Sequence, residues 1–360
     1  MTSFPTRLIK KLEERLEAGN LRKLAVRDQG IDFYSNDYLG LSSYETTAQT
    51  SAYSFNPGSS RLIAGTTNEH LSFERKFAQQ FTHEAALLFI SGYSANCGLF
   101  SAIGLKDTVF VYDEFIHASI KDGLRLSFSK SFSFKHNDLA DAERLLKKFK
   151  GQHVFIVVES LYSMHGDFAP LKEIARLAQE YGVDWIVDEA HTGGLFGKGG
   201  YCEYLSIEPL PIARIVTFGK AYGSSGACVL SSQLVIDYLI NFSRPFIYTT
   251  ALSLNHVKEL EEKVIHSDRS QRQQQLQENI SYFRAQFKQN GMISAPTSPI
   301  QTLHIGDALA AKLSEQECEK NGIHIKAILA PTVPKGAESL RISIHSFNTR
   351  KEIDQLLQFL

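Results

Sequence analysis

The sequence predicts an α/β protein with a mainly parallel central sheet wrapped by helices, followed by a smaller α+β domain. Up to about residue 253, short apolar runs alternate with longer amphipathic segments, and from about Leu254 the chain becomes rich in Glu, Gln, Lys and Arg. Strands that are buried on both faces are continuous apolar runs, and their alternation with helices is typical of a parallel sheet. The change of composition marks the second domain.

Six apolar runs in the first part of the chain are predicted strands: 86–90, 108–112, 154–158, 184–187, 214–218 and 227–230. Between them, apolar residues recur at helical spacing over 71–81, 139–149 and 171–181. A first helix is predicted over 5–25, where leucines recur among charged residues. We therefore expect an N-terminal helix and arm over 1–35 and a large domain over 36–253.

The rest of the chain predicts a small domain. Residues 254–290 carry a polar helical pattern, which predicts one long exposed helix linking the two domains. A strand (301–305), a helix (307–321), a further strand-like segment (322–329), a proline-punctuated loop and a last strand (339–345) follow. The linking helix and small domain are expected to occupy 254–360.

Bulk composition excludes several classes of function. Lys and Arg number 38 against 39 Asp and Glu, so no basic field favours nucleic acid or an anionic membrane surface. No stretch reaches the roughly 18 apolar residues of a membrane span, and the first residues lack the apolar core of a secretion signal. The four cysteines have no metal-ligand spacing. We expect a cytoplasmic enzyme without a metal, a membrane or a nucleic-acid partner.

The segment IVTFGKAYGSSGACVL (215–230) places Lys220 directly after a buried strand, in a loop that contains three glycines. The carboxyl ends of parallel strands border the crevice where α/β sheets bind ligands, and glycines let backbone approach a ligand closely. A surface lysine in a flexible turn would give the same local pattern. This segment alone leaves both interpretations open.

The segment WIVDEAHTGGLFG (185–197) brings Asp188 and His191 to the end of another strand. A carboxylate there could hold a cationic ring nitrogen, and an imidazole could hydrogen-bond a phenolic oxygen. DEAH is also a signature of nucleotide hydrolases, which need a GxxxxGK[ST] phosphate loop. No such loop occurs, because Lys198 in GGLFGKGG is followed by glycine.

Three further segments place polar groups at strand ends. In LLFISGYSANCGLF (87–100), a predicted strand is followed by Gly92 and Tyr93, whose amides could bind phosphate at a helix N-terminus. An ordinary strand–helix turn would have the same sequence pattern. His117 follows the strand TVFVY and could stack on a flat ring, and Glu159 and Ser163 follow a third strand. Together these residues predict one site at the sheet edge.

The order of the motifs resembles the α-oxoamine synthases, enzymes of the aspartate aminotransferase fold (fold type I) that use pyridoxal 5'-phosphate (PLP). The resemblance covers nearly the whole chain. Within the family, the chain most resembles the 8-amino-7-oxononanoate synthases of biotin biosynthesis. The segments are SNDYLGLS, PGSSRLIAG, SGYSAN, HASIKDG, ESLYSMHGD, VDEAHTGG, TFGKAYGSSGA, RPFIYTTALS and PTVPKGAESLRIS.

The resemblance implies a role for each residue that matches a family motif. Lys220 matches the Schiff-base lysine, Asp188 the partner of the pyridinium nitrogen, and His117 the ring-stacking histidine. The remaining matches are His191 and Ser163 around the phenolic oxygen, Gly92, Tyr93 and Thr217 at the phosphate, Thr250 reaching the phosphate of the neighbouring subunit, Arg341 on the amino-acid carboxylate, and Asn36 and Arg22 on the substrate side. A homodimer with a shared active site follows from the role of Thr250.

The implied reaction is a decarboxylative condensation of L-alanine with a pimeloyl thioester, on CoA or acyl carrier protein, that gives 8-amino-7-oxononanoate. Two related activities are alternatives: that of a 2-amino-3-ketobutyrate CoA ligase, which uses glycine and acetyl-CoA, and that of another α-oxoamine synthase such as a serine palmitoyltransferase. A non-catalytic cofactor-binding scaffold is a further alternative, against which the joint presence of Lys220, Asp188, His117 and Arg341 argues.

Overall fold

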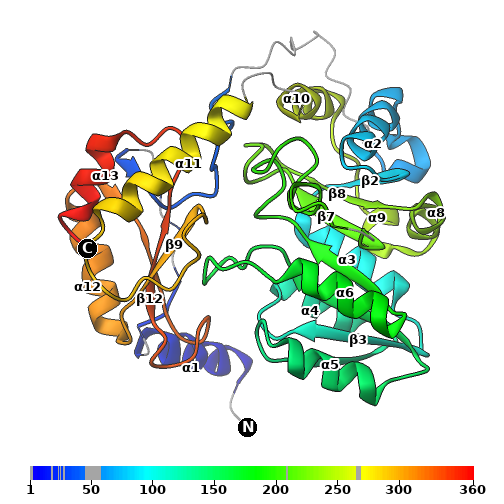
Figure 1. Ribbon diagram of the computed structural model, residues 1–360, viewed down its shortest axis with the longest axis horizontal. Coiled ribbons are helices and arrows are strands. Elements are labelled where there is room, and N and C mark those ends of the chain that lie inside the picture. The colour runs from blue at the N-terminus through cyan, green and yellow to red at the C-terminus, as the bar shows by residue number, and fades with distance from the viewer. Residues whose placement is uncertain are drawn as a thin grey trace.

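The computed structural model describes residues 3–17, 19–22, 24, 26, 29–44, 58–207, 210–264 and 269–360. Two regions lie next to each other in Figure 1: a large sheet with its helices on the right, and a smaller sheet with its helices on the left. Within the described residues, no helix is both long enough and apolar enough to cross a membrane.

The large region is built on a seven-stranded sheet with the order β2-β8-β7-β6-β5-β3-β4. Its strands are β2 (Ala85–Phe89), β3 (Thr108–Asp113), β4 (Lys130–Phe134), β5 (His153–Glu159), β6 (Asp184–Asp188), β7 (Ala213–Thr217) and β8 (Ala227–Ser231). β8 runs antiparallel to both of its neighbours, whereas β4, β3, β5, β6 and β7 pair in parallel. The predicted mainly parallel sheet is confirmed.

Both faces of this sheet are buried, because successive residues of each strand point to opposite sides. Phe110 on β3 packs in one apolar cluster with Leu99 and Ile120, whereas its neighbour Val109 packs in another with Leu145. The helices of this region are α2 (Asn68–Gln80), α3 (Gly92–Ile103), α4 (Ala118–Leu126), α5 (Leu139–Lys148), α6 (Leu171–Tyr181), α7 (Tyr201–Tyr204), α8 (Gln233–Phe242), α9 (Arg244–Ile247) and α10 (Leu254–Val264), with a π-helical turn at Arg61–Gly65.

The six predicted strands and three predicted helices all form, each shifted by no more than about three residues at an end. The sequence analysis missed β4, whose residues KSFSF alternate polar and apolar side chains. β4 is an edge strand paired only with β3 among the described residues, and its first residues are exposed. A continuous apolar run therefore does not mark it.

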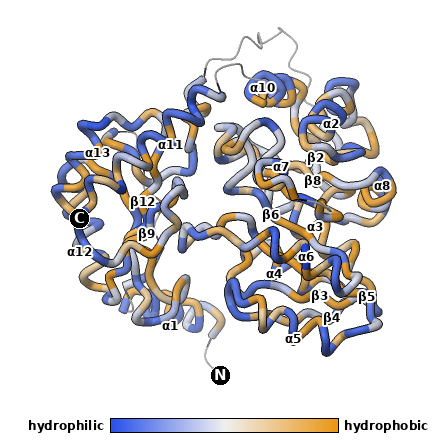
Figure 2. The backbone as a smooth tube through the Cα atoms, viewed as in Figure 1, coloured by the Kyte–Doolittle hydropathy of each residue, from blue (hydrophilic) through white to orange (hydrophobic). Residues whose placement is uncertain are grey.

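The small region contains the antiparallel sheet β11-β12-β9, formed by β9 (Ile300–His304), β11 (Lys326–Ile328) and β12 (Ser339–Ser343). Its helices are α11 (Arg269–Gln286), α12 (Ala308–Lys320) and α13 (Arg350–Leu357). β1 (Ile31–Asp32) pairs in parallel with β10 (Ile323–His324) and ties the N-terminal arm to this region. Figure 2 shows mixed hydrophilic and hydrophobic colour on the outer helix α12 and hydrophobic colour along central strands such as β6.

Two helix predictions were wrong in extent. α1 (Phe4–Glu17) ends well before residue 25, because Gly19 adopts a left-handed conformation (φ 66°) and closes a turn on Leu16. The single helix predicted over 254–290 is described as α10 and α11, with residues 265–268 between them outside the described part. Neither is wholly exposed: α10 buries Leu260 and α11 buries Phe283.

Candidate active site

The carboxyl ends of the parallel strands border a pocket of about 320 Å³. β2, β3, β5, β6 and β7 each deliver a lining residue at their last position or in the loop that follows, because parallel strands end at one edge of a sheet. The polar residues that line the pocket are Asn36, Ser91, Tyr93, Asn96, His117, Ser119, Glu159, Asp188, His191, Thr217, Lys220 and Ser225.

Asp188 ends β6 and is held in place through both carboxylate oxygens. Oδ1 accepts a hydrogen bond from the backbone N–H of Ala190 (2.8 Å), and Oδ2 accepts one from Nδ2 of Asn96 (2.8 Å). Asp188 is 4% exposed. These two donors hold the carboxyl group of Asp188 in one orientation at the pocket floor.

His117 follows β3 and stands at the opening of the pocket. Its Nδ1 lies 2.7 Å from Oγ of Ser119 and accepts a hydrogen bond from the Ser119 backbone N–H (3.2 Å). Ser119 Oγ in turn accepts from Nδ2 of Asn96 (3.0 Å). Desolvation against the pocket wall lowers the pKa of His117, with Asp188 opposing the shift. The accepting Nδ1 and the lowered pKa both indicate a neutral ring.

Lys220 is the only lysine that lines this pocket in the described chain. Burial lowers its pKa to about 8, although the carboxyl groups of Asp188 and Glu159 favour the charged form. Burial, and then the charge of Asp188, raise the pKa of Glu159 well above its usual range. Burial therefore favours the uncharged form of both groups, the carboxyl of Glu159 and the amine of Lys220.

The loop that carries Lys220 is locked by a close approach. Gly223 has φ 55°, and a Cβ there would lie 2.1 Å from the backbone nitrogen of Ser42. Lys263 is 3% exposed and donates through Nζ to the carbonyl of Gly223 (2.7 Å), which fixes the turn from the other side. The backbone conformation of this loop therefore requires glycine at this position.

A polar chain links His191 to the small region. His191 Nδ1 lies 2.7 Å from the Tyr38 hydroxyl, which donates to Oδ1 of Asn36 (3.2 Å). Arg341 of β12 donates through Nη2 to the same Asn36 oxygen (2.8 Å). Burial and the cations Lys220 and Arg341 lower the pKa of His191 well below its usual range. His191 is therefore neutral, and the guanidinium lies behind Asn36 at the pocket edge.

The N-terminus of α3 closes one end of the pocket. Ser91 caps the helix by accepting from the Ser94 backbone N–H, and the first amides are those of Gly92 and Tyr93. A Cβ on Gly92 would lie 2.5 Å from Cγ2 of Thr217, so glycine is needed for the helix end to reach Thr217. The unpaired first amides and the helix dipole make this end of the pocket suited to an anion.

Four predicted site residues lie outside this pocket lining: Ser163, Thr250, Arg22 and Arg341. Ser163 contacts Arg341 through its backbone carbonyl, which accepts from Nε (2.7 Å). Thr250 is exposed and forms an isolated bridge with Ser60. Arg22 is exposed on the N-terminal arm. The structure thus brings Lys220, Asp188, His117, His191, Gly92, Tyr93, Thr217 and Asn36 to one pocket, with Arg341 behind Asn36.

Sequence reasoning missed the residues that orient these groups. Asn96 and Ser119 join Asp188 to His117, and Tyr38 joins His191 to Asn36. Each lies within a segment quoted above, in SGYSAN, HASIKDG and SNDYLGLS, so the motifs signalled them. What the motifs did not signal is which residues pair across the fold.

The chain matches the model of the family "Aminotransferase class I and II" over residues 28–360. It is 37% identical to an 8-amino-7-oxononanoate synthase of Alkalilimnicola ehrlichii, covering 92% of this chain and 87% of that relative. A second relative of that name, from Enterobacter sp., is 36% identical, with 95% and 92% covered. This chain belongs to the class I and II aminotransferase family, in the group of the 8-amino-7-oxononanoate synthases. The expected family is confirmed.

Solved structures agree with the expected fold. An 8-amino-7-oxononanoate synthase from Francisella tularensis superposes with a TM-score of 0.78 at 29% identity, covering 92% of this chain and 97% of the other. A serine palmitoyltransferase from S. paucimobilis, solved with bound PLP and myriocin, superposes with a TM-score of 0.90 at 24% identity, covering 99% and 97%. Fold type I is confirmed, and the chain is a PLP-dependent acyltransferase.

The residues of the pocket fit PLP. The cofactor combines an aldehyde, a ring nitrogen that is cationic when protonated, and a phosphate. The pocket offers an amine with a lowered pKa (Lys220), a fixed carboxylate (Asp188) and a helix N-terminus beside Thr217. Among the described residues, no group of three or more His, Cys, Asp or Glu side chains could hold a metal ion.

Proposed function

We propose that this chain condenses L-alanine with a pimeloyl thioester and releases 8-amino-7-oxononanoate, carbon dioxide and the free thiol. The observation that carries the proposal is that Lys220, Asp188 and His117 line one pocket and that Arg341 lies at its edge behind Asn36. The relatives named 8-amino-7-oxononanoate synthase support the choice of substrates. The acyl carrier is CoA or acyl carrier protein.

The proposed cofactor contacts follow from where each group stands. Asp188 would hold a proton on the ring nitrogen, and His117 at the pocket opening would cover one ring face. The amides of Gly92 and Tyr93, with the hydroxyl of Thr217, would bind the phosphate. The remaining proposed contacts are those of His191 and Ser163 near the phenolic oxygen. When bound, PLP supplies the electron sink that makes a carbanion next to an amine accessible.

Lys220 has two proposed tasks that depend on the same lowered pKa. An unprotonated Nζ would hold the cofactor through its aldehyde, and an unprotonated Nζ is also the form that can take the proton from the substrate Cα. With a pKa of about 8, a useful fraction of the amine is unprotonated near neutral pH. An ordinary exposed lysine is almost fully protonated there.

Arg341 is proposed to hold the amino-acid carboxylate. Its guanidinium is 6% exposed and is fixed on three sides by the Ser163 carbonyl, by Oγ of Ser343 (3.0 Å) and by Oδ1 of Asn36. A planar guanidinium held in this way binds a carboxylate in one orientation. That orientation determines which bond of the substrate Cα is activated. We place Asn36 and Arg22 on the substrate side with it.

The test uses purified protein supplied with PLP, L-alanine and either pimeloyl-CoA or pimeloyl acyl carrier protein. We expect stoichiometric release of thiol and of 8-amino-7-oxononanoate with one of the two carriers. Glycine with acetyl-CoA and L-serine with palmitoyl-CoA are run in parallel. Faster turnover of either of these pairs would assign the chain to a sister activity, and no thiol release from any pair would refute the proposed reaction.

We also propose that two copies form a homodimer in which each completes the other's site. Thr250 lies outside the pocket of its own chain and is exposed, which suits a residue that reaches a neighbouring subunit. Large apolar side chains are exposed close to it in sequence, with Tyr248 at 72%, and others lie on the segment that bridges to it, with Ile63 at 83%. Exposed apolar surface of this kind is typical of a contact with a partner.

Complementation tests the shared site. Lys220→Ala and Thr250→Ala variants are each expected to be weakly active, and mixed subunits are expected to regain activity because one of their two sites is intact. The mixture is made by co-expression with two different tags, and the mixed dimer is purified through both. A monomer in light scattering, or mixed dimers no more active than the parents, would contradict the shared site.

A further inference from the structure

The loop between β5 and α6 belongs to the large region and packs against the small region. We call residues 160–169 the contact turn. It is closed by its own backbone, since Tyr162 N–H donates to the Asp167 carbonyl (3.0 Å) and Gly166 N–H donates to the Tyr162 carbonyl (2.8 Å). A Cβ at Gly166 would lie 2.2 Å from the carbonyl oxygen of Ile300, so the turn packs directly on β9.

The small region holds this turn through two successive carbonyls. Arg341 Nε donates to the Ser163 carbonyl (2.7 Å), and Oγ1 of Thr302 donates to the Met164 carbonyl (3.1 Å). Thr302 and Arg341 are register partners in the β9–β12 pairing. The position of the turn is therefore coupled to the orientation of the Arg341 guanidinium.

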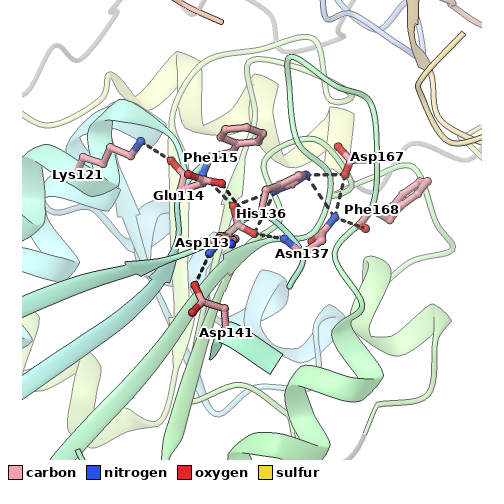
Figure 3. A network of polar contacts seen from close by, with 10 residues as sticks. Asp113, Glu114, Phe115, Lys121, His136, Asn137, Asp141, Asp167 and Phe168 are labelled. Carbon is pink, nitrogen blue, oxygen red and sulfur yellow. Dashed lines mark hydrogen bonds and ion pairs between the residues drawn. The ribbon is translucent and has the colours of Figure 1, made fainter. Parts of the chain in front are cut away.

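On its other side, the turn is fixed to the large sheet by His136, as Figure 3 shows. His136 Nδ1 lies 3.0 Å from Oδ1 of Asp113, at the end of β3, and His136 Nε2 lies 2.7 Å from Oδ2 of Asp167, in the turn. Asn137 adds a parallel link, since its N–H donates to Asp113 (2.8 Å) and its Nδ2 donates to Asp167 (2.8 Å). Both ring nitrogens of His136 thus face carboxylates.

The groups around His136 favour its charged form. Although burial opposes it, hydrogen bonds and the charges of Asp113 and Asp167 raise the pKa of His136 to about 9. The other polar or titratable neighbours are Glu114, which accepts the His136 N–H (3.0 Å), Tyr162, which packs edge-on (4.5 Å between ring centroids), and His165 (5.7 Å). Burial lowers the pKa of His165, so it adds no second positive charge.

We propose that His136, as a cation between Asp113 and Asp167, is a positioning residue that holds the contact turn where its Ser163 carbonyl orients Arg341 for the carboxylate of the amino-acid substrate. This inference rests on the proposed role of Arg341. His136 lines no part of the pocket, so it acts through the turn and not on the substrate. Asp167 Oδ1 is buried with no hydrogen-bond partner in the described chain, which leaves its charge dependent on Oδ2 contacts such as that of His136.

The test compares holoenzyme variants that remove either charge. In His136→Gln and Asp167→Asn, we expect the Kd of L-alanine, measured from the change in cofactor absorbance, to rise about tenfold, since charge-assisted hydrogen bonds are the strong ones. The double variant is expected to match the singles, because either change breaks the same link. The KM of the pimeloyl thioester is expected to stay at the wild-type value. His153→Gln, a histidine exposed at the start of β5, is the matched control.

Several results would overturn the inference. They are an unchanged amino-acid Kd in His136→Gln, an equal rise in the Kd of the amino acid and the KM of the thioester, and additive effects in the double variant. If the wild type responds to glycine or L-serine but not to L-alanine, the proposed substrate is wrong, and the same comparison is made with the amino acid that binds. The two failures are therefore distinguishable.

Two further readouts separate positioning from a loss of folding. Without any substrate, amide hydrogen exchange over 160–169 and 339–343 is expected to rise in His136→Gln and not in His153→Gln. Unchanged exchange in His136→Gln would contradict the positioning role of His136. The ratio of the amino-acid Kd of His136→Gln to that of the wild type is expected to fall from about ten near pH 7 towards one as pH rises through about 9, because wild-type His136 then loses its charge. A ratio that is constant with pH would contradict the role of the charge.

Discussion

Two histidines at the same sheet edge, His191 and His136, differ in charge. His191 in the pocket is 6% exposed and neutral, whereas the His136 side chain, next to the contact turn, is 17% exposed and protonated. Burial alone would lower the pKa of both. The difference lies in the neighbours: His191 faces the cations Lys220 and Arg341, whereas His136 faces a carboxylate at each nitrogen.

The contrast shows how one fold separates two tasks that need different imidazoles. Pocket histidines that stay neutral can hydrogen-bond and stack without repelling a protonated ring nitrogen held by Asp188. The histidine outside the pocket serves as a fixed cation that joins two elements. The charge of Asp188 does not keep His117 protonated, because burial lowers the pKa of His117 by more than Asp188 raises it.

Removing the pocket cation tests this contrast with the largest expected effect. Lys220→Ala is expected to lower turnover by about 10⁴-fold, because both the bond to the cofactor and the base for the Cα proton are lost. The variant is expected to retain PLP through the phosphate contacts but to lose the visible absorbance that depends on the bond between PLP and Lys220. Lys198→Ala, at an exposed lysine in a neighbouring glycine-rich loop, is the control. An unchanged spectrum in Lys220→Ala would refute the assignment.

The two pocket carboxyl groups are expected to respond differently to the same chemical change. Asp188→Asn removes a negative charge and is expected to lower kcat by about 100-fold, the value of a lost charge-assisted hydrogen bond. Glu159→Gln replaces a carboxyl group whose raised pKa favours its uncharged form, so we expect a loss of about threefold or less. Steady-state kinetics on both variants give the comparison. Equal losses would mean that Glu159 is ionised.

The charge of His136 predicts how stability depends on pH. Its pKa is about 9 in the folded protein and about 6.5 in the unfolded chain. The stabilisation, up to about 3 kcal/mol, is therefore fully present below pH 6.5 and is lost as pH rises through about 9. Urea unfolding of wild type and His136→Gln from pH 6 to 10 measures it. Curves that run parallel across this range would show that His136 is neutral in the folded state.

The sequence predicted the pocket better than the contact turn for a physical reason. Lys220, Asp188 and His117 each follow a buried strand, and parallel strands end at one edge, so local patterns are enough to bring them together. His136 pairs with residues 23 and 31 positions away. No periodicity links them, and the strand before His136 was itself missed because it lies at the sheet edge.

Arg341 shows the same limit within the active site. The resemblance named it as the carboxylate ligand, but its orientation depends on a backbone carbonyl of Ser163, 178 positions away. A backbone acceptor leaves no mark in the sequence, because any side chain could stand at that position. The predicted side-chain role of Ser163 stays a prediction, while its carbonyl has a contact that only the fold reveals.

A steric change in the pocket, which leaves every charge in place, sharpens the contrast with the smallest expected effect. Gly92→Ala places a methyl group 2.5 Å from Cγ2 of Thr217, and overpacking of this kind typically costs about 1–3 kcal/mol, so we expect PLP affinity to fall about tenfold. Thr217→Ser removes the clashing methyl group and keeps the hydroxyl. The double variant Gly92→Ala/Thr217→Ser should therefore bind PLP nearly as well as Thr217→Ser alone, as measured by equilibrium dialysis. If the double variant bound no better than Gly92→Ala, the loss of PLP affinity would come from the backbone of the helix end and not from this contact. The phosphate site would then have to lie elsewhere along α3.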